Sequence, residues 1–124
     1  MNMNEIKLLN GPSITPSSGK VEKIVLFIHG YGASGNDLIG IGKYWKDRMP
    51  NTAFYSPNAP FICDFNPSGF QWFPLNERTK KELKDGLDTS EPFLENYVKK
   101  ILDKNNLEPR KLIVVGFSQG TILS

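Results

Sequence analysis

Two short segments of this chain consist almost entirely of large apolar residues. Residues 24–28 read Ile-Val-Leu-Phe-Ile, and residues 112–115 read Leu-Ile-Val-Val. Neither segment alternates apolar and polar residues, as a strand with one face in water would, so both are predicted to be strands buried on both faces. Strands of that kind are typical of parallel sheets covered by helices, which predicts the α/β fold class.

Helices are predicted in the segments that follow each early strand. Residues 37–49 carry apolar side chains at helical spacing, and Asn36 or Asp37 is the expected N-cap. A second helix is predicted to start from an N-cap at Ser90, with a proline in its first turn, and to end near Asn105. Its apolar positions form one stripe, so it is expected to pack against the sheet.

The remaining segments carry weaker signals. Residues 6–9 and 52–56 predict two short strands, and residues 10–20 read as a loop because Gly, Pro, Ser and Thr dominate there. Residues 57–75 predict a long irregular loop rich in aromatic residues, and the mixed charges of residues 77–88 favour a solvated helix turn or a loop. The main elements therefore alternate as strand, helix, strand, helix and strand, without internal repeats.

A Gly-x-Ser-x-Gly motif follows directly on the strand predicted at residues 112–115. It comprises Gly116, Phe117, Ser118, Gln119 and Gly120. In a nucleophile elbow the serine sits on a strained turn between a strand and a helix, and small neighbours relieve crowding there. The motif and its position together predict Ser118 as a catalytic nucleophile.

A second glycine-rich segment follows the other buried strand. Residues 29–35 read His-Gly-Tyr-Gly-Ala-Ser-Gly, and Gly30, Gly32 and Gly35 spell the dinucleotide-binding pattern Gly-x-Gly-x-x-Gly. That site also needs an acidic residue about 20 positions later, at the end of the next strand, to bind the ribose. Residues 55–57 read Tyr-Ser-Pro instead, so a nucleotide-binding module is kept only as the weaker alternative.

Composition excludes several classes of function. Fifteen Lys and Arg residues against 13 Asp and Glu residues give a net charge of +2 without a basic cluster, which argues against nucleic acid as a partner. No apolar run approaches the roughly 20 residues of a membrane span. The single cysteine, Cys63, cannot form an internal disulfide, and we expect a cytoplasmic protein.

Four motifs in this order resemble the phospholipase/carboxylesterase family, which includes the acyl-protein thioesterases. They are residues 29–35, Ser-Pro-Asn-Ala-Pro at 56–60, Gln-Trp-Phe at 71–73, and Gly-Phe-Ser-Gln-Gly at 116–120. The resemblance implies an α/β-hydrolase fold that hydrolyses carboxylic esters or thioesters of small molecules or acylated proteins. It implies no metal or organic cofactor.

The resemblance also implies roles for five residues. Ser118 is expected to form the acyl-enzyme. The backbone N–H groups of Tyr31 and Gln119 are expected to form the oxyanion hole, with side chains that can be replaced. Trp72 and Phe73 are expected beside the acyl-binding groove.

A serine nucleophile also needs an acid and a histidine, which in this fold follow it in the chain. Only six residues follow Ser118, and none is Asp, Glu or His. We therefore expect residues 1–124 to be the N-terminal part of a single α/β-hydrolase domain that needs a complementing C-terminal half. A non-catalytic remnant is the alternative. The single histidine, His29, is expected to shape the oxyanion loop, and a role as base is the weaker possibility.

Overall fold

The computed structural model describes residues 7–123, and in it the two apolar segments are neighbouring strands of one sheet. Strand β2 (Lys23–Ile28) pairs in parallel with β6 (Leu112–Gly116) on one side and with β3 (Thr52–Tyr55) on the other. A short strand β1 (Ser13–Ile14) pairs antiparallel with β3, which gives the order β1-β3-β2-β6. The mostly parallel sheet expected from the sequence is confirmed.

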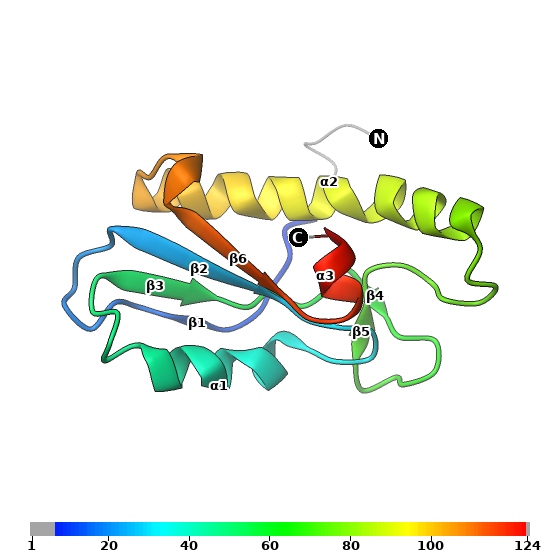
Figure 1. The fold of residues 1–124 in the computed structure, drawn as a ribbon, viewed down its shortest axis with the longest axis horizontal. Coiled ribbons are helices and arrows are strands. Elements are labelled where there is room, and N and C mark those ends of the chain that lie inside the picture. Colours follow the sequence, from blue (N-terminus) through cyan, green and yellow to red (C-terminus); the bar gives the residue numbers. More distant parts are fainter. Residues whose placement is uncertain (1–6, 124) are drawn as a thin grey trace.

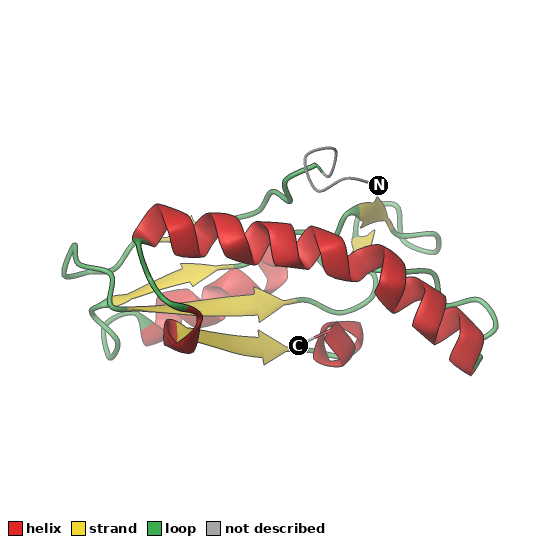
Figure 2. Cartoon of the chain, turned by 90° about the horizontal axis from the view of Figure 1, so that it is seen from above, coloured by secondary structure: helices red, strands yellow, loops and turns green. Residues whose placement is uncertain are grey.

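The sheet is covered by one helix on each face, α1 (Gly35–Trp45) and α2 (Lys80–Asn105), as Figures 1 and 2 show. Successive residues of β2 point to opposite faces. Ile24, Leu26 and Ile28 join the core beneath α2, whereas Val25 and Phe27 join the core beneath α1. None of these five side chains is more than 1% exposed, so the predicted burial of this strand on both faces is confirmed.

Helix α1 begins earlier than the sequence predicted. Its N-cap is Ser34 instead of Asn36 or Asp37, because the Asp37 carboxylate accepts a hydrogen bond from the Ser34 backbone N–H at 2.8 Å. The Ser34 side chain in turn faces the backbone N–H of Asp37, and these two reciprocal contacts form a capping box. The helix ends at Trp45, four residues before the predicted end.

Helix α2 is far longer than predicted, because the mixed-charge segment forms its first turns. Thr79 is the N-cap and accepts a hydrogen bond from the backbone N–H of Glu82. The prediction of an N-cap at Ser90 is wrong: the helix continues through Pro92, and the Ser90 hydroxyl donates to the Gly86 carbonyl at 2.7 Å. The predicted end is confirmed, since Asn106 closes the helix in a left-handed conformation.

Two loop predictions also need correction. The segment of residues 57–75 contains an antiparallel pair of two-residue strands, β4 (Phe61–Ile62) and β5 (Phe70–Gln71). Residues 7–9 form no strand, while Ile6 lies outside the described residues, and the first strand lies instead in the predicted loop. A 3-10 turn (Pro109–Lys111) precedes β6, and α3 (Gln119–Leu123) follows it. Among the helices of residues 7–123, none has the length and hydrophobicity of a membrane-spanning segment.

Two helical glycines allow the packing of α2 to be tested. A methyl group at Gly86 would collide with the ring of Phe73, whereas one at Gly40 of α1 would meet no atom within 4 Å. We expect Gly86→Ala to lower the free energy of unfolding by about 1–3 kcal/mol through overpacking. Gly40→Ala should raise it by about 0.5–1 kcal/mol through helix propensity. Urea denaturation measures both, and equal stability of the two variants would contradict this packing.

Candidate active site

Ser118 occupies the sharp turn between β6 and α3. Its φ is 53°, in the left-handed region that residues with a side chain rarely adopt. The Gly120 N–H donates to the Phe117 carbonyl at 2.9 Å, and the Phe117 N–H donates to the Ile28 carbonyl of β2 at 3.0 Å. The strained turn predicted from the motif is confirmed, and its conformation is held by the surrounding backbone.

The two motif glycines are required by close backbone contacts. A Cβ atom at Gly120 would collide with the Ile28 carbonyl oxygen, and one at Gly116 would lie 2.7 Å from the Gly120 carbonyl oxygen. The first helical turn after the serine therefore packs directly against the end of β2. A larger residue at either position would push the turn away from the sheet.

The glycine-rich segment after β2 lies beside Ser118. Ile28 and Gly116 are paired residues at the ends of neighbouring strands. A Cβ atom at Gly30 would lie 3.0 Å from the Ser118 Cβ and 3.7 Å from its hydroxyl oxygen. The structure thus brings together the two motifs that the sequence separates by more than 80 positions.

The backbone donors of Tyr31 and Gln119, near this serine, remain free. Within residues 7–123, the N–H groups of Tyr31 and Gln119 donate to no acceptor. Tyr31 directly follows Gly30, and Gln119 directly follows Ser118. Free N–H groups in such positions are what an acyl-transfer site requires to hold the oxygen of a tetrahedral intermediate.

The side chain of Tyr31 does not supply a ready proton. Burial raises its pKa to about 12, and the neighbouring Cys63 thiol adds to the shift. The phenol therefore stays neutral at physiological pH.

The backbone N–H groups of residues 32–35 in the glycine-rich loop are occupied, which argues against the nucleotide-binding alternative. The Gly32 N–H donates to the Phe70 carbonyl at 2.9 Å, and the Gly35 N–H donates to the Asn58 side chain at 2.7 Å. A phosphate site needs such N–H groups to point at the ligand. Here they tie the loop to its neighbours instead.

The Gln119 side chain makes two buried hydrogen bonds that the sequence did not predict. It is 2% exposed, its Oε1 accepts from the Trp72 backbone N–H at 2.9 Å, and its Nε2 donates to the Phe73 carbonyl at 2.9 Å. These two bonds give the side chain a structural role beyond the backbone role expected from the sequence. It joins the residue after the nucleophile to a segment 46 and 47 positions earlier in the chain.

Trp72 and Phe73, the residues expected beside an acyl groove, are both buried. Trp72 is 0% exposed, and its indole N–H donates to the His29 carbonyl at 2.9 Å. Phe73 is 1% exposed, and it forms part of the wall of a cavity. Among the described residues, Phe73 lines this cavity and Trp72 does not.

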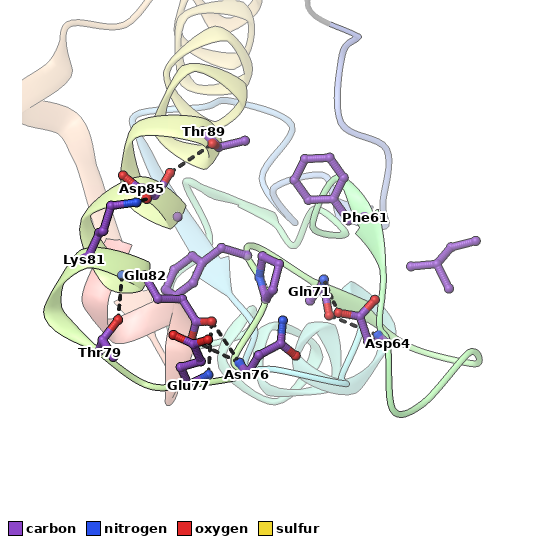
Figure 3. A pocket seen from close by; sticks show the side chains of 14 residues that line it. Phe61, Asp64, Gln71, Asn76, Glu77, Thr79, Lys81, Glu82, Asp85 and Thr89 are labelled. Atoms are coloured by element: carbon purple, nitrogen blue, oxygen red, sulfur yellow. Dashed lines mark hydrogen bonds and ion pairs between the residues drawn. The ribbon is translucent and has the colours of Figure 1, made fainter.

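This cavity, of about 710 Å³, lies between the β4–β5 hairpin and the first turns of α2 (Figure 3). Its wall combines Phe61 and Phe73 with several carboxylates. The Glu82 carboxylate accepts hydrogen bonds from the backbone N–H groups of Arg78, Glu77 and Asn76, which hold the pKa of Glu82 below its usual value. These bonds fix the loop that closes one end of the cavity.

Comparison with known proteins places these features in a class. The family model of phospholipases and carboxylesterases matches residues 9–124. Esterase PE8 has a known structure that is 38% identical and superposes with a TM-score of 0.90, over 94% of this chain and 55% of that one. A phospholipase/carboxylesterase from Dyadobacter fermentans, 20% identical with a TM-score of 0.64 over 94% of this chain and 52% of that one, shares the fold.

Curated relatives agree with this comparison. Acyl-protein thioesterase 1 of Saccharomyces cerevisiae is 29% identical over 94% of this chain and 55% of its own length. The corresponding protein of Candida albicans is 32% identical over 88% of this chain and 52% of its own length. The chain therefore spans about half the length of the relatives that it matches.

A mostly parallel sheet between helices, with a serine on a strained turn at its edge, defines the α/β-hydrolase class. Within that class, the chain belongs to the phospholipase/carboxylesterase family.

The Gln119 contacts can be tested by two substitutions. Gln119→Ala leaves the Trp72 N–H and the Phe73 carbonyl unpaired in the interior, so we expect the free energy of unfolding to fall by about 2–4 kcal/mol. Gln119→Glu should be milder at pH 5 than at pH 8, because burial raises the pKa of the new carboxyl above its unfolded value of about 4.3 and only the protonated form can donate to Phe73. Denaturant titrations at both pH values measure this, and a loss below about 0.5 kcal/mol for Gln119→Ala would show that the contacts are unimportant.

Proposed function

We propose that this chain carries the nucleophile and the oxyanion hole of a serine hydrolase acting on carboxylic esters or thioesters. The Ser118 hydroxyl oxygen attacks the carbonyl carbon, and the Tyr31 and Gln119 N–H groups stabilise the oxyanion of the tetrahedral intermediate. The ester C–O or thioester C–S bond then breaks, the alcohol or thiol leaves with the proton lost by the serine, and Ser118 remains acylated. The observation that carries the proposal is the left-handed Ser118 turn beside two free backbone donors. The names of the esterase and thioesterase relatives support the choice of substrate class.

The general base must come from outside the described residues under this proposal. The only histidine of the chain, His29, is fully buried, and both of its ring nitrogens contact backbone groups. Without a base, a serine hydroxyl is a poor nucleophile at neutral pH. A non-catalytic role for the chain by itself is the second candidate. It is favoured because both ring nitrogens of His29 are already hydrogen-bonded and cannot act as a base for Ser118.

A complementing half of the hydrolase domain is the proposed source of the missing acid and histidine. Within the described sheet, β6 is an outer strand, and its neighbourhood exposes large apolar side chains. They are Ile113, Val114, Phe117 and Ile122, each between 39% and 48% exposed. A further parallel strand and its helix would cover them, as expected for a strand whose composition suits the sheet interior.

The proposal also covers where the acyl chain binds and in which compartment of the cell the protein lies. The acyl chain is proposed to lie along the wall to which Phe73 contributes, and Trp72 is proposed to border the same groove. Phe61 and Phe73 supply apolar side chains to that wall. A cytoplasmic location is proposed because the single cysteine is a free thiol.

Complementation tests the nucleophile. The chain alone should hydrolyse a short-chain activated ester no faster than its Ser118→Ala variant. Addition of the separately expressed C-terminal part of esterase PE8 should produce turnover, and a fluorophosphonate probe should then label Ser118. Ser118→Ala in the same mixture should show no turnover above that of the PE8 part. Labelling of Ser34, Ser56 or Ser90 in place of Ser118 would refute the assignment.

The oxyanion hole is tested at Tyr31 in the completed protein. Tyr31→Pro deletes the backbone donor and should lower kcat/KM by about 100-fold to 1000-fold. Tyr31→Phe removes only the buried hydroxyl and should retain most of the activity. Steady-state kinetics measure both variants, and equal losses would assign the function to the side chain instead of the backbone.

A further inference from the structure

His29 is held by backbone contacts at both ring nitrogens. It directly follows β2 at the start of the glycine-rich loop and is 0% exposed. Its Nδ1 lies 2.7 Å from the Gly30 carbonyl oxygen, and its Nε2 lies 2.9 Å from the Ala59 backbone nitrogen. An amide N–H can only donate, so Nε2 accepts and Nδ1 carries the proton. The ring is therefore fixed as the neutral Nδ1–H tautomer.

The carbonyl that His29 contacts belongs to the same peptide group as the Tyr31 N–H. This peptide is trans, so its C=O and N–H bonds point in opposite directions. The Ala33 N–H donates to the same carbonyl at 3.2 Å. Two donors thus fix the carbonyl, and the Tyr31 N–H on the opposite side is left without an acceptor in the described chain.

Donation to a carbonyl does more than orient the peptide. It polarises the amide, which makes the N–H on the other side a stronger donor. Gly30 borders Ser118, so this peptide lies where the oxygen of a reacting acyl group would need a donor.

We propose that His29 is a positioning residue, which orients and polarises the Tyr31 N–H through the Gly30 carbonyl. The effect of His29 on catalysis rests on the proposed function, whereas its hydrogen bonds to Gly30 and Ala59 are seen in the structure. The ring cannot easily turn, because the Trp72 ring packs against it at a centroid distance of 5.6 Å and the Trp72 indole N–H donates to the His29 carbonyl.

The electrostatics agree with a neutral ring. Burial lowers the pKa of His29 below its ordinary value of 6.5, and outweighs the opposing effects of the Gly30 hydrogen bond and of Asp37. Protonation would replace the Nε2 lone pair by a second N–H facing the Ala59 N–H. Neutrality therefore preserves both contacts of the ring.

NMR spectroscopy of the chain as it stands tests the arrangement without any assay of activity. The ring nitrogens of the wild type should show the Nδ1–H tautomer at pH 7. His29→Gln can accept from Ala59 but cannot reach the Gly30 carbonyl, so the Gly30 carbonyl carbon and the Tyr31 amide nitrogen should both move upfield. His29→Asn places an amide donor near the Nδ1 position, so these two signals should stay closer to wild type while the Ala59 amide signal moves.

An Nε2–H tautomer in the wild type would overturn the proposal, as would unchanged Gly30 and Tyr31 signals in His29→Gln. A kinetic arm uses the protein completed by the PE8 part. There His29→Gln should lower kcat on the order of 10-fold to 100-fold with little change in KM, and His29→Asn should lose less. Equal kcat losses in an active protein would also overturn it. Absence of Ser118-dependent turnover in the completed wild type would instead overturn the proposed function.

Discussion

The parallel pairing of β2 with β6 is the constraint on which the rest of the site depends. Its register places Ile28 opposite Gly116, so the chain leaves both strands at the same edge. The Phe117 N–H then reaches the Ile28 carbonyl, and Gly120 packs against the same residue. A shift of one residue in this register would break these contacts and reverse the faces of every side chain in β6.

Buried polar groups then fix what the strand pairing brings together. The Trp72 indole N–H bonds the His29 carbonyl, and the Trp72 backbone N–H bonds the Gln119 side chain. One tryptophan thus connects the loop after β2 with the turn after β6. Each of these groups would be costly to leave unpaired in the interior, so the network favours a single arrangement of both loops.

The sequence predicted well those features that local pattern determines. The run of residues 24–28 predicted a strand buried on both faces, and the glycines around Ser118 predicted a crowded turn, because both depend on near neighbours. The start of α2 was mispredicted because Ser90 and the following proline have the pattern of a helix start, although the actual cap is Thr79. The added turns pack closely against Phe73 at Gly86, a tertiary contact that the residues around Ser90 do not reveal.

The polar network around Ser118 could not be predicted, because it links residues more than 40 positions apart. Nothing in the residues near Gln119 indicates that its side chain bonds the backbone of Trp72 and Phe73. The ring contacts of His29 likewise depend on Ala59, which is 30 positions away. The capping box at Ser34 and Asp37 did carry a local signal, since its spacing is that of the motif.

The contact between Gln119 and Phe73 gives one residue two roles in the structure. Phe73 lines the cavity, and its backbone carbonyl accepts a hydrogen bond from the side chain of the residue that follows Ser118. A substitution of Phe73 that displaced its backbone would therefore also weaken a bond made by the first residue of α3. A change at this one position bears on both the cavity wall and the turn of the nucleophile.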